Sequence, residues 1–158
     1  MKVSEKRKLY RKQIDKDIDN LNRSIVALSY SHDKCSKIRV AKEAYGLDEQ
    51  ESFEALASRF ARSSDMLTQK VLKSLFILLQ ENVKTIIDGA NLLERLDIID
   101  SADDLLNIRE VRNQIAHDYV TENINDFYLE VLSYVPLLKR IVDQLIVFYK
   151  HKFGEKGS

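Results

Sequence analysis

The chain contains few of the residues that interrupt helices. It has four Gly and one Pro among 158 residues, whereas strands and hairpins need frequent Gly and Pro at their turns. Leu, Ile, Lys, Glu, Asp and Arg dominate the composition, and apolar residues recur at intervals of three and four along most of the chain. This combination predicts an all-α protein built from long helices.

The apolar periodicity predicts an up-and-down bundle of four main helices and one short helix. Two helix starts match the capping-box pattern, in which a small polar residue is followed three positions later by an acidic one. These pairs are Asp48 with Glu51 and Ser101 with Asp104. The expected main helices cover about 2–45, 48–80, 102–119 and 123–151, and the expected short helix covers about 85–96.

Length and charge limit the classes of protein that fit. A chain of this length suits one domain, so we expect residues 1–152 to fold together and 153–158 to form a disordered tail. The 25 basic and 25 acidic residues give a net charge of zero, which disfavours a broad duplex-binding surface but leaves a local basic pocket open. Cys35 is the single cysteine, which excludes a disulfide within the chain and a cysteine metal cage.

Neither a membrane span nor a secretion signal is predicted. No window approaches 18 uninterrupted apolar residues, and the N-terminal residues 1–13 have no apolar core. The acidic residues of 97–104 sit where a helix dipole favours carboxylates, so we interpret them as a helix start and expect no metal or other cofactor. A cytoplasmic protein follows from these patterns.

The helix expected over 102–119 has an apolar side and a polar side. The apolar positions have helical spacing and predict the buried side: Leu105, Ile108, Val111 and Ile115. At about 100° per residue, Arg112 and His117 lie about 140° apart around the axis, with Arg109 and Asn113 between them. A permanent cation beside an imidazole suits chemistry at a phosphate, and Arg109 and Asn113 would help to position that phosphate.

A second polar strip follows the helix expected over 48–80. Its members, Arg59, Arg62, Asp65 and Gln69, recur at spacings of three and four. Such a strip is most often a solvated surface with weak ion pairs. If it instead faces Arg112, then Arg62 and Asp65 would support the reacting groups from a second helix.

Cleavage of RNA without a metal needs groups of this kind. A base must take the proton of the attacking 2′-hydroxyl, an acid must protonate the leaving 5′-oxygen, and a cation must stabilise the phosphoryl oxygens. One chain supplies a single histidine in this context, so a two-fold dimer would bring together two His117 and two Arg112 side chains.

The spacing of Arg112 and His117 also has a purely structural explanation. An Arg and a His five residues apart are common by chance, and a histidine at a helix end can simply cap the helix.

The residues Arg112 to His117, RNQIAH, resemble the R-x4-H signature of HEPN domains. His117-Asp118-Tyr119 extends the pattern to R-x4-H-x-Y, which is typical of the HepT-like branch, the toxin halves of HepT/MntA toxin–antitoxin pairs. The resemblance implies an all-helical homodimer whose two motifs meet in a cleft and cleave RNA without a metal.

The resemblance also implies a role for each residue of the motif. Arg112 would bind and polarise the phosphate, His117 would transfer protons, and Asn113 would orient the substrate. Tyr119 would be the tyrosine that a cognate nucleotidyltransferase antitoxin modifies with AMP. Such a modification would add negative charge beside the cleft and obstruct it.

Two other interpretations remain open at the level of sequence. The protein would be a non-catalytic helical subunit that binds a nucleotide or a protein as the partner of a small nucleotidyltransferase, or it would be a purely structural helical dimer. Binding without RNA turnover separates the first of these from a nuclease.

Overall fold

The computed structural model describes residues 3–38, 44–117 and 124–154, and within these ranges it contains helices and no strand. The all-α prediction is therefore confirmed for the described residues. The elements are α1 (Val3–Ser36), α2 (Leu47–Asp65), a π-helical turn η1 (Met66–Val71), α3 (Leu72–Leu78), α4 (Ile86–Arg95), α5 (Ala102–Ala116) and α6 (Ile124–Phe153).

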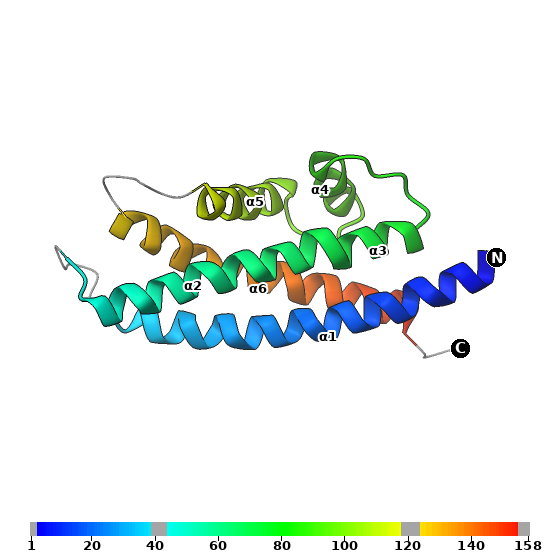
Figure 1. Ribbon diagram of the computed structural model, residues 1–158. Helices are drawn as coiled ribbons and strands as arrows, with labels where there is room; N and C mark the ends of the chain where they lie inside the picture. Colours follow the sequence, from blue (N-terminus) through cyan, green and yellow to red (C-terminus); the bar gives the residue numbers. More distant parts are fainter. Residues whose placement is uncertain (1–2, 39–43, 118–123, 155–158) are drawn as a thin grey trace.

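Three long helical segments run alongside one another, and two helices lie against them. Figure 1 shows α1, the continuous rod formed by α2, η1 and α3, and α6 extending along the length of the molecule. Helices α4 and α5 lie on the side of this rod away from α1. Helix α5 packs against α2, α4 and α6. One side of α5 is thus held against the other helices, and the rest is available to solvent.

The packed sides of the helices form one hydrophobic core. On α2, the large apolar side chains Phe53, Leu56 and Phe60 are all 0% exposed. Where α1 and α2 meet, the Ser63 hydroxyl donates to the Ser24 hydroxyl at 2.9 Å, and both residues are buried. The small size of these side chains lets the two helices approach closely.

The second helix differs from the sequence expectation in its middle. Residues 47–78 are helical throughout, but the turn Met66–Val71 is of the π type, and the Leu72 N–H donates to the Leu67 carbonyl five residues back. A π turn shifts the rotational phase of the residues that follow it, and such turns are frequent at functional sites. Asp65 lies directly before this turn.

The first helix is shorter than its periodicity suggests. It ends at Ser36 rather than near residue 45, and the amides of Lys37 and Ile38 bond to carbonyls three residues back. Such bonds tighten and close the last turn of a helix. The apolar pattern of α1 predicted its packing but not its end.

The predicted start of the second helix was wrong by one to two residues. Gly46, not Asp48, occupies the N-cap position, and its N–H donates to the Glu49 carboxylate at 3.0 Å. By contrast, Ser101 is the N-cap of α5 as predicted, and its hydroxyl accepts from the Asp103 N–H at 3.2 Å.

The last two helices also end at positions that differ from the prediction. Helix α5 ends at Ala116, three residues before the expected end, and residues 118–123 lie outside the described ranges. Helix α6 extends through Phe153, which is buried at 8% exposure. The expected tail therefore does not begin at Phe153, because burial of this ring keeps the last turn helical.

None of the described helices has both the length and the apolarity that crossing a bilayer requires.

Candidate functional site

The orientation of α5 is determined by its apolar side. Leu105 and Ile108 are 0% exposed and Val111 is 2% exposed, while Ile115 is partly buried against the core. These residues pack the helix against α2 and α6. Because successive residues are about 100° apart, Arg112 then projects from the edge of the buried side, toward α2.

Arg112 forms a bidentate ion pair with Asp65 of α2. The Arg112 Nε lies 2.6 Å from Asp65 Oδ1, and Nη2 lies 2.9 Å from Oδ2. The planar guanidinium and the carboxylate match in this fork geometry, which fixes the orientation of the guanidinium. Hydrogen bonding to Asp65, reinforced by its charge, raises the pKa of Arg112 against a smaller opposing effect of burial.

The ion pair leaves part of the guanidinium available. A guanidinium has five N–H donors, and the described residues accept hydrogen bonds from two of those of Arg112. The side chains of Arg112 and Asp65 are 27% and 39% exposed. Arg112 can therefore offer further donors to a solvent-borne anion while Asp65 holds it, although the carboxylate reduces the net attraction.

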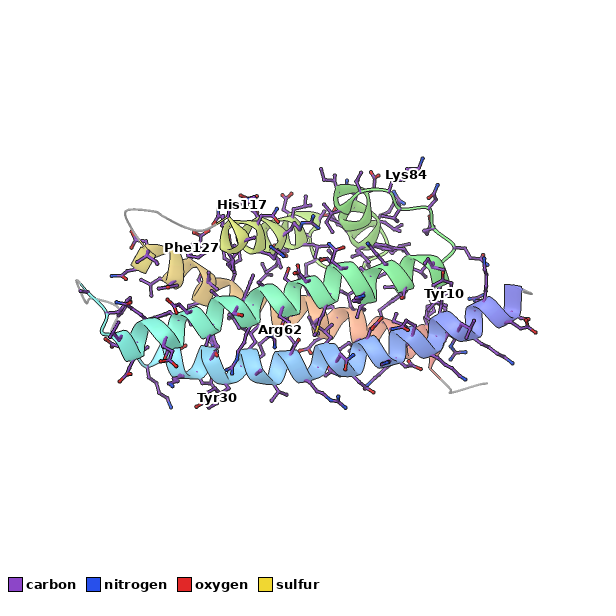
Figure 2. All side chains as sticks on the ribbon, viewed as in Figure 1. Tyr10, Tyr30, Arg62, Lys84, His117 and Phe127 are labelled. Carbon is purple, nitrogen blue, oxygen red and sulfur yellow. The ribbon has the colours of Figure 1, made fainter. Side chains whose placement is uncertain are left out.

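His117 lies at the C-terminal end of α5, on the side of the molecule away from α1 (Figure 2). It is the C-cap residue, and its backbone N–H donates to the Asn113 carbonyl at 3.0 Å. Its side chain is exposed, and that of Asn113 is half-buried. Tyr119, the third residue of the motif, lies outside the described residues.

The other predicted residues of the site lie on either side of the ion pair. Arg62 is exposed and borders, together with Asp65 and Gln69, a hollow of about 390 Å³ along α2 and η1. Arg109 lies one turn before Arg112 and borders a different hollow, between α3 and α4. The structure thus brings Asp65 into direct contact with Arg112, with Arg62 beside the carboxylate.

Arg59, the first member of the predicted polar strip, points elsewhere. Its Nη1 donates to the Ser31 hydroxyl at 2.8 Å and to the Ala27 carbonyl at 3.3 Å, and its guanidinium lies 5.9 Å from the centre of the Tyr30 ring. It therefore faces α1 and not α5. The prediction of one continuous strip was wrong at this position.

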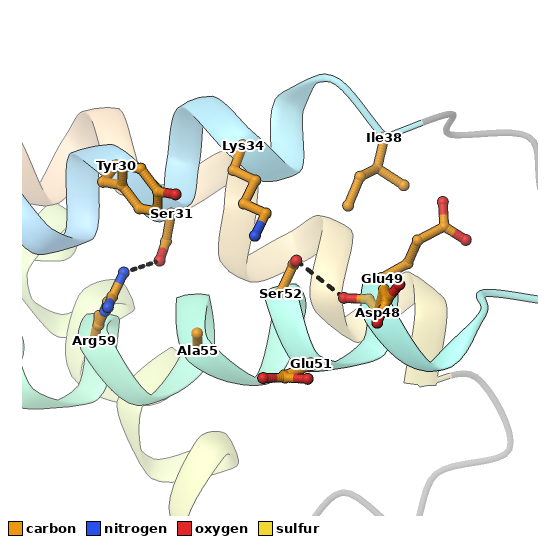
Figure 3. A pocket seen from close by; sticks show the side chains of 10 residues that line it. All are labelled: Tyr30, Ser31, Lys34, Ile38, Asp48, Glu49, Glu51, Ser52, Ala55 and Arg59. Carbon is orange, nitrogen blue, oxygen red and sulfur yellow. Dashed lines mark hydrogen bonds between the residues drawn. The ribbon is translucent and has the colours of Figure 1, made fainter.

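A hollow of about 600 Å³ lies beside Arg59, between the end of α1 and the start of α2 (Figure 3). It mixes Lys34 and Arg59 with carboxylates of the first turns of α2. Glu49 accepts from the Gly46 N–H, and the Ser52 hydroxyl donates to the Asp48 carbonyl at 3.0 Å. These polar groups serve the helix start and the α1–α2 contact, so we do not assign a reaction to this hollow.

Two basic residues near Arg109 were missed by the sequence reasoning. Lys73 and Lys84 border the same hollow as Arg109. Lys73 follows Gln69 by four residues, and the spacing continues the polar strip beyond the π turn. Lys84 comes from the segment between α3 and α4, where no periodicity marks a residue.

Within the described ranges, no three His, Cys, Asp or Glu side chains gather as a group that could hold a metal ion. Comparisons of the chain with protein-family models, with curated proteins and with solved structures return no match. The chemistry of the site must therefore be derived from its own residues.

Proposed function

We propose that the protein is a metal-independent endoribonuclease of the HEPN type, the toxin half of a HepT/MntA-like pair, acting in the cytoplasm. The observation that carries this proposal is that Arg112 and His117 both reach solvent on one helix whose opposite side is buried. A phosphate-binding cation and a proton-transfer group must both be accessible if they are to meet an RNA strand.

The reaction proceeds by internal transfer at phosphorus. The 2′-hydroxyl loses its proton to one imidazole and attacks the adjacent phosphorus, and the bond from phosphorus to the 5′-oxygen breaks. A second, protonated imidazole gives its proton to that leaving oxygen. The products are a 2′,3′-cyclic phosphate and a 5′-hydroxyl, and the remaining donors of Arg112 stabilise the charge on the phosphoryl oxygens.

The two proton transfers require a second histidine, which we assign to a second copy of the chain. The other two histidines of the chain lie on other helices. His32 is on α1 and borders a hollow next to α6, and His151 is in the last turn of α6. A homodimer in which the C-terminal ends of the two α5 helices face each other supplies two His117 side chains to one composite cleft.

Asp65 is a positioning residue in this proposal. Its bidentate contact holds the Arg112 guanidinium in one orientation, which lowers the conformational cost of aligning it with a phosphate. The neighbouring Arg62 adds positive charge beside the Asp65 carboxylate, and Asn113 orients the substrate from the next position of α5.

Regulation by a nucleotidyltransferase antitoxin follows from the same resemblance. Tyr119 stands two residues after His117 in the sequence. Attachment of AMP there would bring negative charge and bulk close to His117 and compete with the RNA phosphate.

The direct test is incubation of the purified protein with RNA in the presence of EDTA. We expect cleavage by the wild type, and loss of cleavage in both Arg112→Ala and His117→Ala. Gln114→Ala is the matched control, because Gln114 is exposed on the same turn of α5 and has no role in the proposal. Absence of cleavage by the wild type, or full activity in both variants, would reject the ribonuclease.

The Arg112–Asp65 ion pair also favours a second candidate function. Because Asp65 already balances the charge of Arg112, the site is less attractive to a phosphate than a free guanidinium would be. A non-catalytic subunit that binds a nucleotide or a nucleotidyltransferase fits this observation. Tight binding of the nucleotide or the partner protein with no RNA turnover would favour it.

A further inference from the structure

The hollow that Arg109 borders has an apolar floor. Its volume is about 360 Å³, which is within the range of small-ligand sites. The floor comprises Leu72 and Phe76 of α3 with Val83 and Ile86 from the following segment and the first turn of α4. Leu72 and Phe76 are buried, at 1% and 8% exposure, so the accessible apolar surface comes from the half-exposed Val83 and Ile86 and from the neighbouring Ile77, which is 46% exposed. These partly exposed aliphatic side chains can pack against one face of a planar ring.

The wall of the hollow depends on two backbone features. Gln80 has a left-handed conformation with φ of 58°, and the Glu81 N–H donates to the Phe76 carbonyl at 3.0 Å, which turns the chain back across the end of α3. Behind the floor, a Cβ at Gly89 would lie 3.0 Å from two ring atoms of Phe76 and 3.3 Å from Val83 Cγ1. Glycine therefore lets α4 close onto the floor.

The rim of the hollow is basic. Lys73, Lys84 and Arg109 line it together with one acidic residue, Glu81. Lys73 and Lys84 are exposed and Arg109 is half-buried, and Lys84 lies at the edge of the molecule next to α4 (Figure 2). The local excess of positive charge contrasts with the net charge of zero of the whole chain, so this rim favours an anionic ligand.

The hollow and the Arg112 site are neighbours along the rod formed by α2, η1 and α3. Gln69 borders both this hollow and the one beside Asp65 and Arg62. Arg109 precedes Arg112 by three residues and His117 by eight, or about 5 Å and 12 Å along the axis of an α-helix. A single strand that passes His117 and Arg112 can therefore reach the hollow within a few nucleotides.

We propose that the hollow between α3 and α4 is a subsite for a nucleotide that flanks the cleaved phosphate of a single-stranded RNA. The base lies on the apolar floor, and Lys73, Lys84 and Arg109 bind the phosphates on either side of it. Stacking of bases on apolar and aromatic surfaces combined with a basic groove is the usual way to hold single strands. This inference rests on the proposed ribonuclease function, because that function supplies RNA as the ligand.

The test measures binding of a short 2′-O-methyl RNA, which the proposed reaction cannot cleave, by fluorescence anisotropy over a series of salt concentrations. The variant is Lys73→Glu/Lys84→Glu, whose two exposed side chains can be reversed without disturbing the core. The matched control is Lys12→Glu/Lys16→Glu, since both lysines are exposed on α1 and the net charge changes equally. Circular dichroism establishes that all three proteins are folded.

We expect the Lys73→Glu/Lys84→Glu variant to bind the RNA about tenfold or more weakly than the wild type, with a salt dependence shallower by about two phosphate contacts. The control should bind nearly as well as the wild type. Equal losses in the two variants would indicate a general charge effect and would overturn the subsite, as would unchanged binding by the first variant or no binding by the wild type.

Cleavage of the unmodified RNA separates the two proposals. A wild-type protein that binds the methylated RNA through Lys73 and Lys84 but cleaves nothing supports the hollow as a site for single-stranded RNA and rejects the ribonuclease. A wild-type protein that cleaves RNA with no contribution from these lysines supports the ribonuclease and overturns the subsite.

Discussion

Two aspartates of this protein each join a pair of helices, and their surroundings differ. Asp15 on α1 accepts from the Tyr149 hydroxyl of α6 at 2.7 Å, and Tyr149 is 5% exposed. Asp65 on α2 accepts twice from Arg112 of α5, whose side chain is 27% exposed. Tyr149 has one hydroxyl to donate, whereas Arg112 keeps donors that can still meet a ligand.

The contrast indicates what each contact does. At the α1–α6 end, Arg11 also donates to the Phe153 carbonyl, so the polar groups there hold the last turn of α6 against α1. Burial and the hydrogen bond to Asp15 raise the pKa of Tyr149 to about 12. The α1–α6 contact therefore contributes to stability, while the α2–α5 contact orients a charge toward solvent.

The largest expected effect is on stability, for a substitution on the buried side of α5 that packs against α2. Ile108→Asp places a carboxylate at a position that is 0% exposed and should cost about 4 kcal/mol or more, enough to unfold the protein. Arg112→Ala should leave it folded, because Asp65 is then hydrated. Thermal unfolding followed by circular dichroism distinguishes the two, and equal losses of stability would contradict the assigned orientation of α5.

The next effect concerns activity alone. His117→Ala and Arg112→Ala should each lower the rate of RNA cleavage by about 100-fold or more, because each removes a proton-transfer group or a charge-stabilising donor. The same variants should melt within a few degrees of the wild type. Tyr149→Phe should cleave RNA at the wild-type rate, and a comparable loss of activity in that variant would remove the distinction between the two contacts.

For Asp65→Asn we expect a smaller effect, which lowers both KM and kcat. The amide keeps the shape of the carboxylate but not its charge, so Arg112 should attract phosphate more strongly and be oriented less well. We expect a lower KM together with a kcat reduced by about tenfold. Steady-state kinetics of a short RNA report both constants.

Glu110→Gln is the control for this variant, because Glu110 is exposed on the same helix. An increase of KM with unchanged kcat in Asp65→Asn would mean that Asp65 contributes to binding the substrate rather than to orienting Arg112.

The smallest effect lies at the α1–α6 end. Tyr149→Phe should lower the free energy of unfolding by about 1 kcal/mol near neutral pH through loss of the hydrogen bond to Asp15. The pKa of Tyr149 is raised from 10.0 to about 12, so the unfolded chain loses this proton first as pH rises. Stability from Tyr149 is thus present below pH 10 and declines between pH 10 and about pH 12.

Denaturant unfolding of the wild type and Tyr149→Phe across this alkaline range measures the effect. The wild-type advantage should shrink as pH rises toward 12. A constant difference at all pH values would mean that Tyr149 ionises alike in the folded and unfolded chains.

The sequence predicted those features that repeat along a helix. The spacing of Leu105, Ile108 and Val111 was sufficient to identify the buried side of α5, and Ser101 marked its start. Both follow from local rules that hold whatever the helix packs against. The partial exposure of Arg112 follows from the same periodicity, whereas His117 lies just past the end of α5, where periodicity no longer applies.

Features that depend on a neighbouring helix were harder to predict. Nothing in the spacing of Arg59 and Asp65 reveals that the first bonds to α1 and the second to α5. The π turn at Met66–Val71 changes the helical register after Asp65, and no residue type or spacing in the sequence marks it. Lys84 enters the basic rim from a connecting segment, where only the tertiary fold decides its neighbours.

The measurement that tests the central claim most directly is RNA cleavage, in EDTA, by wild-type chains mixed with an excess of His117→Ala chains and allowed to exchange partners. If two histidines from two chains form the site, a tenfold excess of the variant should lower the activity per wild-type chain by about tenfold, because most wild-type chains then have an inactive partner. Activity per wild-type chain that stays constant, or a wild type that does not cleave RNA at all, would contradict a composite ribonuclease site.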